Sequence, residues 1–173
     1  MSGDEITKLR RENEEYRTIF DNSPLMVWFK DREGRHIRVN EKVAQLEGLP
    51  VSDIEGKTHW QLYPQEQADA FYADDREVIT TGQPKIDIIE AHTSPALGQM
   101  VWLRTNKVPY REPDGAISGV LVFAVNITSQ VELKNQILIE LNALERMVEE
   151  KADTKFILDH IRLVKERVNE KQF

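Results

Sequence analysis

The side chains that could do chemistry are few and lie far apart along the chain. None of the histidines has a carboxylate or a second histidine at i+3 or i+4, the spacing that a metal site on a helix needs. The paired acids Asp74–Asp75 and Glu149–Glu150 are typical of solvated helix faces, and no serine occurs in a nucleophile-elbow context. We therefore expect no metal site and no catalytic site. The histidines are His36, His59, His92 and His160.

Composition narrows the class of protein and its partners. The chain has 173 residues, of which 40% are apolar and 31% charged, as in a soluble domain of ordinary size with appendages. With 23 basic and 30 acidic residues, its net charge is −7. Such a surface repels phosphate backbones and anionic lipid, so we expect no nucleic-acid partner and no membrane partner.

Several classes are excluded by what the chain lacks. It has no cysteine, which excludes disulfides, thiolate metal sites and cysteinyl adducts with a chromophore. Its start, Met1–Glu5, has neither the basic nor the apolar region of a signal peptide, and its longest apolar run, Val120–Val125, is too short to span a bilayer. We expect a cytoplasmic protein.

Strand and helix patterns alternate through the middle of the chain. Asn40 can cap a short helix, and a helical stretch broken by Gly56 and Pro64 runs from Ser52 to Gly82. Two strands precede this stretch and three follow it, with turn residues at the hairpins. The predicted strands are 25–29, 35–39, 85–92, 99–109 and 116–127. This order predicts an α+β fold, with an antiparallel sheet and helices gathered on one face.

Helices are predicted on both sides of this region. From Asp4 to Asp21, a coiled-coil seam forms if Asn13 takes one core position, and an amphipathic helix packed on its own domain is the alternative. Ser129 and Glu132 fit a capping box, after which two apolar seams that are out of phase predict a kink or a helical hairpin at 149–155. The coiled-coil seam of the N-terminal helix consists of Ile6, Leu9, Asn13, Tyr16 and Phe20. We expect three parts, at 1–21, 22–128 and 129–173.

The ordered set of segments from about Tyr16 to Thr128 resembles the PAS family, particularly the PAS domains of bacterial sensor histidine kinases and related receptors. The segments are WFKDREGRHIRVN, GKTHWQLYP, ADDREVITTGQP, LRTNKVPYREPDGAISGVL and VNIT. The resemblance implies a five-stranded antiparallel sheet cupped by short helices, an internal pocket, and a sensor function that moves the flanking helices. One departure is Asn126-Ile127-Thr128, where the family usually has Asp-Ile-Thr; the asparagine cannot make the aspartate's ion pair.

The resemblance also allows each known PAS cofactor to be tested against the sequence. Covalent flavin photosensors need a cysteine, and they place a glutamine where this chain has Ala124. Haem-binding members supply a histidine from the helix before the third strand, and the corresponding stretch, Tyr72–Thr81, contains none. We therefore expect no cofactor, which leaves a small organic ligand or a packed core that binds nothing.

Strand alternation and the resemblance together select candidate ligand-binding residues. For each of them, core packing is the competing interpretation. Lys30 and His59 stand out, because a cation in an apolar cup needs a partner such as a ligand carboxylate. We favour the alternative that Lys30 extends to the rim and that His59 caps a loop. The candidates are Trp28, Lys30, His59, Trp60, Tyr63, Phe71, Tyr72, Ile79, Leu103, Thr105, Val122 and Ala124.

The predicted function is a signal-sensing module that binds a small molecule. It would transmit the signal through flanking helices in a homodimer to a downstream domain or protein of a two-component-like system. The alternative is a constitutive dimerisation scaffold with no ligand. We expect no enzyme, because the helix at 129–150 has no phosphoacceptor histidine and no glycine follows Gly119 to build an ATP lid.

Overall fold

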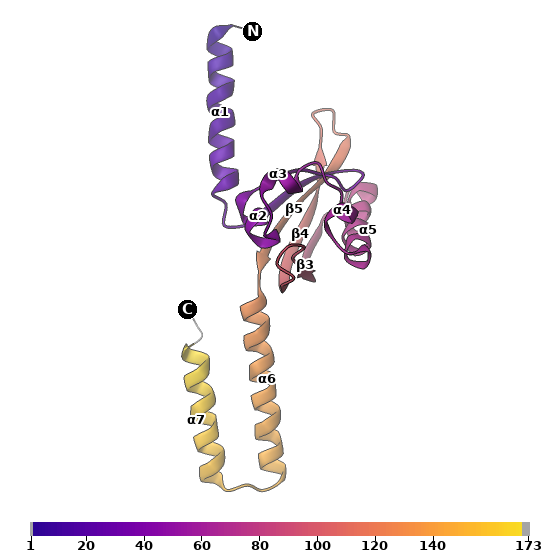
Figure 1. The fold of residues 1–173 in the computed structure, drawn as a ribbon. Coiled ribbons are helices and arrows are strands. Elements are labelled where there is room, and N and C mark those ends of the chain that lie inside the picture. The colour runs from indigo at the N-terminus through magenta and orange to yellow at the C-terminus, as the bar shows by residue number, and fades with distance from the viewer. Residues whose placement is uncertain (1, 171–173) are drawn as a thin grey trace. The chain divides into compact units, whose positions relative to one another are not determined.

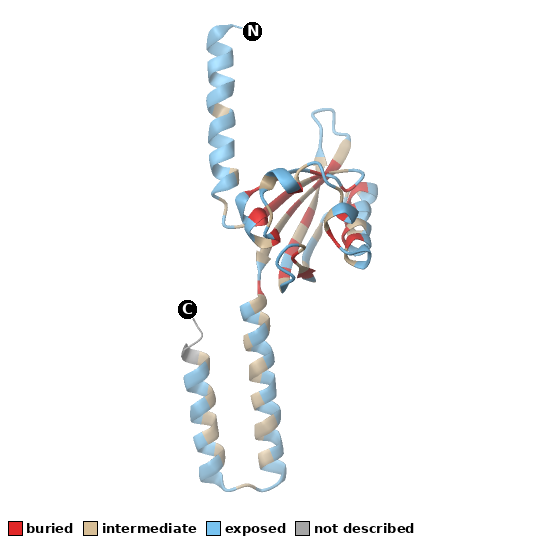
Figure 2. Ribbon diagram, in the orientation of Figure 1, coloured by how far each residue is buried: buried red, intermediate tan, exposed pale blue. Residues whose placement is uncertain are grey.

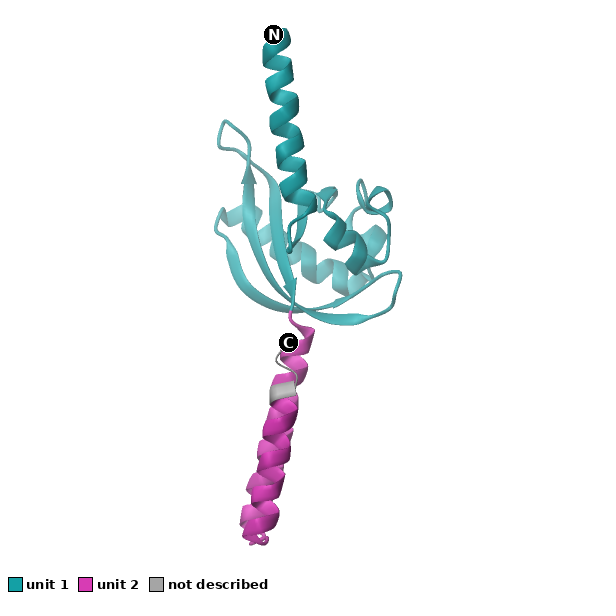
Figure 3. Ribbon diagram, turned by 90° about the vertical axis from the view of Figure 1, so that its left-hand side faces the viewer, with its two compact units in different colours: residues 1–126 teal, residues 127–173 magenta. Residues whose placement is uncertain are grey.

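A computed structural model describes residues 2–170, with side chains through 168, and its chain divides into two compact units between Asn126 and Ile127 (Figure 3). The first unit contains a five-stranded antiparallel sheet in the order β2-β1-β5-β4-β3. The strands are β1 (Met26–Asp31), β2 (His36–Val39), β3 (Lys85–Thr93), β4 (Met100–Arg111) and β5 (Ile117–Asn126). The predicted α+β class and the five strands are confirmed.

Short helices lie over one face of this sheet (Figure 1). Helix α5 packs on β4 and β5, and α2 packs on β1. The helices of the unit are α1 (Gly3–Asp21), α2 (Glu41–Glu47), α3 (Val51–Ile54), α4 (His59–Leu62) and α5 (Gln65–Thr81). The buried residues gather between the sheet and helices α2 to α5, which makes that face the core (Figure 2).

Alternation along the central strands supplies the core face. On β5, Val120, Val122 and Ala124 are buried, while the residues between them are partly exposed. Trp28 lies opposite Val122, so β1 and β5 contribute to the same layer. A Cβ on Gly119 would stand 1.9 Å from the Lys30 carbonyl oxygen, so only glycine lets β1 and β5 approach this closely.

The outer edge of the sheet is irregular. Strand β3 lies at the edge of the sheet and pairs with β4, and its register shifts between Lys85 and Ile88. Asp87, within this bulge, has a left-handed φ of 57°, and its backbone N–H donates to the side chain of Asn106. Ile86 and Ile89 on the same strand are exposed.

Asn40 joins α1, β1 and α2. Its Oδ1 accepts from the backbone N–H groups of Val27 (3.2 Å) and Val43 (3.3 Å), the second of which is the predicted helix cap. Its Nδ2 donates to the carbonyls of Phe20 (3.0 Å) and Leu25 (2.9 Å). Because Asn40 is fully buried, its amide group cannot exchange these partners for water.

The second unit is a helical hairpin, the second of the two predicted forms. Helix α6 (Thr128–Glu149) and helix α7 (Thr154–Glu170) are linked where Glu140 accepts hydrogen bonds from His160 (2.9 Å) and Arg167 (3.0 Å). The predicted cap at Ser129 is wrong. Helix α6 already begins at Thr128 after Ile127, so Ser129 has helical backbone and cannot be the extended residue that a cap requires. Within residues 2–170, no helix combines the length and apolar character of a membrane span.

Replacing Asn40 with alanine should lower the free energy of unfolding by about 3 kcal/mol, because it removes a helix cap and leaves buried backbone groups without partners. Urea unfolding followed by tryptophan fluorescence measures this loss. Asn22→Ala is the matched control, since Asn22 is exposed and its Nδ2 makes one local hydrogen bond to the Thr18 carbonyl. Equal losses for the two variants would contradict the role assigned to Asn40.

Candidate ligand-binding site

A small cavity lies against the core face of the sheet, with α4 and α5 contributing to its wall. Its volume is about 20 Å³, enough for about one water molecule. It is lined by Trp28, Lys30, His59, Tyr63, Phe71, Glu90, His92, Leu103, Thr105, Lys107 and Val122. Aromatic rings form much of the wall: Phe71 and His92 stack with centroids 5.7 Å apart, and Tyr63 meets Phe71 edge-on at 5.4 Å.

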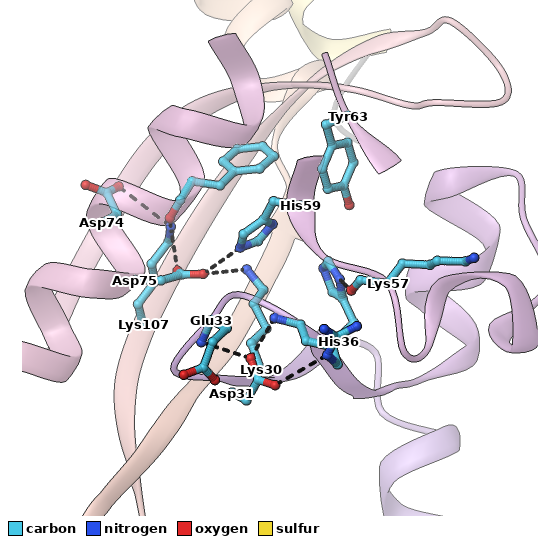
Figure 4. A network of polar contacts seen from close by, with 12 residues as sticks. Lys30, Asp31, Glu33, His36, Lys57, His59, Tyr63, Asp74, Asp75 and Lys107 are labelled. Carbon is cyan, nitrogen blue, oxygen red and sulfur yellow. Dashed lines mark hydrogen bonds and ion pairs between the residues drawn. The ribbon is translucent and has the colours of Figure 1, made fainter. Parts of the chain in front are cut away.

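Asp75 on α5 is the centre of a buried charge cluster (Figure 4). Its Oδ2 accepts from Lys30 Nζ on β1 at 3.0 Å and from His59 Nε2 on α4 at 2.9 Å. Its Oδ1 lies 3.1 Å from Lys107 Nζ on β4. The side chains of Asp75 and His59 are 0% exposed, and those of Lys107 and Lys30 are 1% and 6%. Four elements of the unit therefore meet at one carboxylate.

Lys107 is further held by α5. Its Nζ donates to the carbonyl of Phe71 at 3.3 Å and lies 5.7 Å from the centre of the Phe71 ring. Asp74 approaches the same nitrogen at 3.7 Å, and its other oxygen pairs with Lys85 at 2.6 Å. The two adjacent acids thus have different environments, with Asp74 partly exposed and Asp75 fully buried.

A second buried carboxylate, Glu47 at the end of α2, lies on the other side of the aromatic wall. It accepts from the Tyr63 hydroxyl at 2.6 Å and from His92 Nε2 at 3.1 Å. Burial and the negative charge of Glu47 raise the pKa of Tyr63 well above its ordinary value. Tyr63 is therefore a neutral hydrogen-bond donor that joins α2 to α4.

The protonation states of the cluster follow from burial and neighbouring charge. Burial opposes ionisation of Asp75, but the ammonium of Lys30 and the hydrogen bond from His59 outweigh it and hold the pKa of Asp75 well below its usual range. Burial and the Lys30 charge lower the pKa of His59 to about 4 and that of His36 to about 3. Both imidazoles are neutral at pH 7. His59 donates through Nε2 to Asp75, and His36 donates through Nδ1 to the Lys57 carbonyl.

Several buried polar atoms at the site lack a hydrogen-bond partner among the described residues. They include Thr105 Oγ1, which belongs to the cavity lining, and His59 Nδ1. Unpaired buried polar atoms are uncommon in native proteins and often mark a place for water or ligand. An aromatic wall with a few polar groups is the environment of a small-molecule site. Within residues 2–170, no group of three or more His, Asp or Glu side chains is arranged to hold a metal ion.

Most of the candidate residues selected from the sequence meet at the cavity. Those that line it are Trp28, Lys30, His59, Tyr63, Phe71, Leu103, Thr105 and Val122. Ile79 and Ala124 are buried in the main hydrophobic core instead. Trp60 and Tyr72 lie outside the lining: their rings contact each other at 4.8 Å, and Trp60 Nε1 donates to Asp69 at 2.7 Å.

Three interpretations of the charged residues were wrong. Lys30 does not extend to the rim and His59 does not cap a loop, because both are buried on Asp75. Asp75 itself is not on a solvated face. Lys107 was missed, although it is the next inward position after Leu103 and Thr105 on β4, so strand alternation could have found it.

The comparisons with known proteins support the fold and add a relative. The family model described as PAS fold matches residues 20–132. No curated protein sequence matches the chain. Among solved structures, the receptor VqmA of Vibrio cholerae, described as a LuxR-type receptor in the absence of its target DNA, is 27% identical with a TM-score of 0.59 and covers 67% of this chain and 52% of its own.

Two further VqmA structures carry ligands. VqmA bound to DPO is 26% identical, with a TM-score of 0.59, and covers 69% of this chain and 60% of its own. The V. cholerae VqmA–ligand–DNA complex is 27% identical, with a TM-score of 0.59, and covers 66% and 51%. This chain therefore spans less than two thirds of the length of these relatives.

These relatives correct the expectation that the chain has no nucleic-acid partner. That expectation is wrong, because the similar solved proteins include a receptor in complex with DNA. The physical error was to exclude a nucleic-acid partner on the basis of the net charge of −7. Net charge sums over buried and exposed groups alike, and it does not describe the surface that meets a partner.

The neutral buried histidines predict a loss of stability in mild acid. His36 and His59 have lower pKa values in the folded protein than the ordinary value near 6.5, so the unfolded chain binds their protons first as the pH falls. Their contribution is complete above about pH 6.5 and declines toward about pH 4, which amounts to about 2 kcal/mol for each histidine by pH 5.

Urea unfolding at pH 7 and at pH 5 should therefore show the decline, and His36→Gln should remove about half of it. His160→Gln is the control, because His160 lies in the second unit and is partly exposed. An unchanged decline in His36→Gln would contradict a buried neutral imidazole at this position.

Proposed function

Because the chain belongs to the PAS-fold family, we propose that it is a sensor module that binds a small molecule in the cavity beside α4 and α5. The observation that carries the proposal is the polar end of this cavity. Thr105 presents a buried hydroxyl without a partner among the described residues, and Lys30 and Lys107 line the same cavity. The similar receptor VqmA has been solved bound to DPO and in a complex with a ligand and DNA, which supports a ligand role for this kind of domain.

The signal would leave the domain through its flanking helices. Strand β5 ends at Asn126 and α6 begins at Thr128, so little flexible chain separates the sheet from the helix that follows. We propose a regulatory output in the cytoplasm and no catalytic step in this chain. The likeness to VqmA favours an output at DNA, and a two-component relay is the other form that the output could take.

A scaffold without a ligand is the second candidate function, and one observation favours it. The cavity of about 20 Å³ is too small for any organic molecule as it stands. A sensor must therefore open this site to bind, whereas a scaffold would keep it closed.

The first test is to purify the protein from its own host, record its absorption spectrum, and identify by mass spectrometry what denaturation releases. We expect no haem or flavin band and one small molecule in near-stoichiometric amount. Thr105→Val should reduce the recovered amount about tenfold, because the ligand loses a hydrogen bond inside the cavity. Trp60→Phe, outside the cavity lining, should recover as much as the wild type. Recovery of nothing, from host-purified wild type, would leave the scaffold as the function.

We also propose that the module is a homodimer paired through α1. Ile6, Leu9 and Tyr16 on the seam of α1 are exposed, and Asn13 lies between them. Deleting residues 1–20 should therefore convert the dimer to a monomer in multi-angle light scattering. Leu9→Lys should act in the same direction, and Arg11→Ala, on the opposite side of the helix from the seam, should not. A dimer that survives both the deletion and Leu9→Lys would place the interface elsewhere.

A further inference from the structure

The carboxylate of Asp75 bridges two ammonium groups in a way that a free carboxylate could reproduce. One oxygen takes Lys30 at 3.0 Å and the other takes Lys107 at 3.1 Å. The two lysines come from β1 and β4, which belong to the sheet, while Asp75 comes from α5. The cation side of this contact therefore lies on the sheet, and the anion is supplied by a helix that packs on it.

The ammonium group of Lys30 makes fewer hydrogen bonds than it has N–H donors. An ammonium group has three N–H donors, and among the described residues Asp75 is the one hydrogen-bond acceptor for Lys30. Burial lowers the pKa of Lys30, because a single carboxylate does not replace the water that the ammonium has lost. The neighbouring Thr105 hydroxyl is also without a partner in the described part of the chain.

The other carboxylates nearby are placed differently. Glu47 accepts from Tyr63 and His92, and Asp74 pairs with Lys85. Glu90 lines the cavity from β3 and is half-buried, so solvent screens its charge in part. Asp75 is the acid that contacts both buried lysines directly.

Entry of any ligand requires the wall to move, because the cavity holds about one water molecule. Helix α5 is the wall whose polar contacts with the sheet converge here. They run from Asp75 to Lys30 and Lys107, and from the Phe71 carbonyl to Lys107. Breaking the contacts of Asp75 would weaken the hold on α5 and would vacate a position with two cationic donors.

We propose that Asp75 is a built-in occupant of a carboxylate-binding position, and that a small molecule bearing a carboxylate enters by replacing Asp75 on Lys30 and Lys107. The α5 helix moves away from the sheet as it loses these contacts, so exchange of one carboxylate for another is also the conformational change. This inference rests on the proposed function, since it assumes that the cavity is the ligand site, and it adds the chemical class of the ligand.

Chemical rescue tests the exchange directly. Asp75→Ala removes the carboxylate and leaves space beside the lysines, so it should lower the melting temperature and raise hydrogen exchange in residues 65–81 about tenfold. Sodium acetate should restore at least half of the lost melting temperature in a saturable way, whereas sodium chloride at equal ionic strength should not. Asp74→Ala is the matched control, because the carboxylate of Asp74 is adjacent in sequence but partly exposed. Acetate should raise the melting temperature of this variant no more than chloride does.

The wild-type protein provides a second arm that does not depend on the folding of a variant. Benzoate should increase hydrogen exchange in residues 65–81, and the neutral isostere benzamide should not. Lys30→Met should abolish the difference between the two compounds. Equal effects of benzoate and benzamide, or an acetate effect on Asp75→Ala no larger than that of chloride, would overturn the proposal.

The two proposals can fail separately. A neutral molecule released from the native protein, together with no acetate rescue, would keep the sensor function and overturn the carboxylate exchange. Acetate rescue with no ligand recovered from the native protein would keep the exchangeable position and overturn the sensor function.

Discussion

The buried carboxylate of Asp75 holds the cationic part of the candidate site together. Asp75 contacts two ammonium groups and one imidazole, each from a different element, and all of them are removed from water. Ion pairs of this kind recover in attraction roughly what they lose in hydration, so apolar residues of similar volume would stabilise the fold at least as well. Core stability alone therefore does not account for the charges. Their position beside an unpaired hydroxyl connects them with the cavity instead.

The elements of the fold could be predicted because their signals are local. The hairpin turns, the cap at Asn40 and the alternation on β5 each depend on residues within a few positions of one another. The same patterns, together with the ordered segments that resemble the family, predicted the succession of strands and helices along the chain. The cap expected at Ser129 failed because the boundary between β5 and α6 lies one or two residues earlier than the capping pattern indicated.

The charged part of the site could not be predicted in the same way. Lys30 and Asp75 are 45 residues apart, as are Glu47 and His92, and no local pattern marks either pair. Asp74 and Asp75 are adjacent in sequence, yet one is partly exposed and the other is buried, because consecutive helical residues point in directions about 100° apart. Composition counts the two equally. The aromatic and aliphatic residues of the lining could be predicted from strand alternation, whereas the pairing of the charged side chains depends on the tertiary structure.

The bulge in β3 also has a consequence for solubility. An edge strand with exposed isoleucines is a template on which a second chain can add strands, and this route leads to aggregates and fibrils. In β3 the left-handed backbone at Asp87 interrupts the regular spacing of N–H and C=O groups along the strand, and the N–H of Asp87 donates to the Asn106 side chain of the neighbouring β4. The charged side chains of Lys85 and Asp87 flank Ile86. An incoming strand would therefore find neither a continuous ladder nor a continuous apolar edge along β3, which makes this strand a poor template for polymerisation.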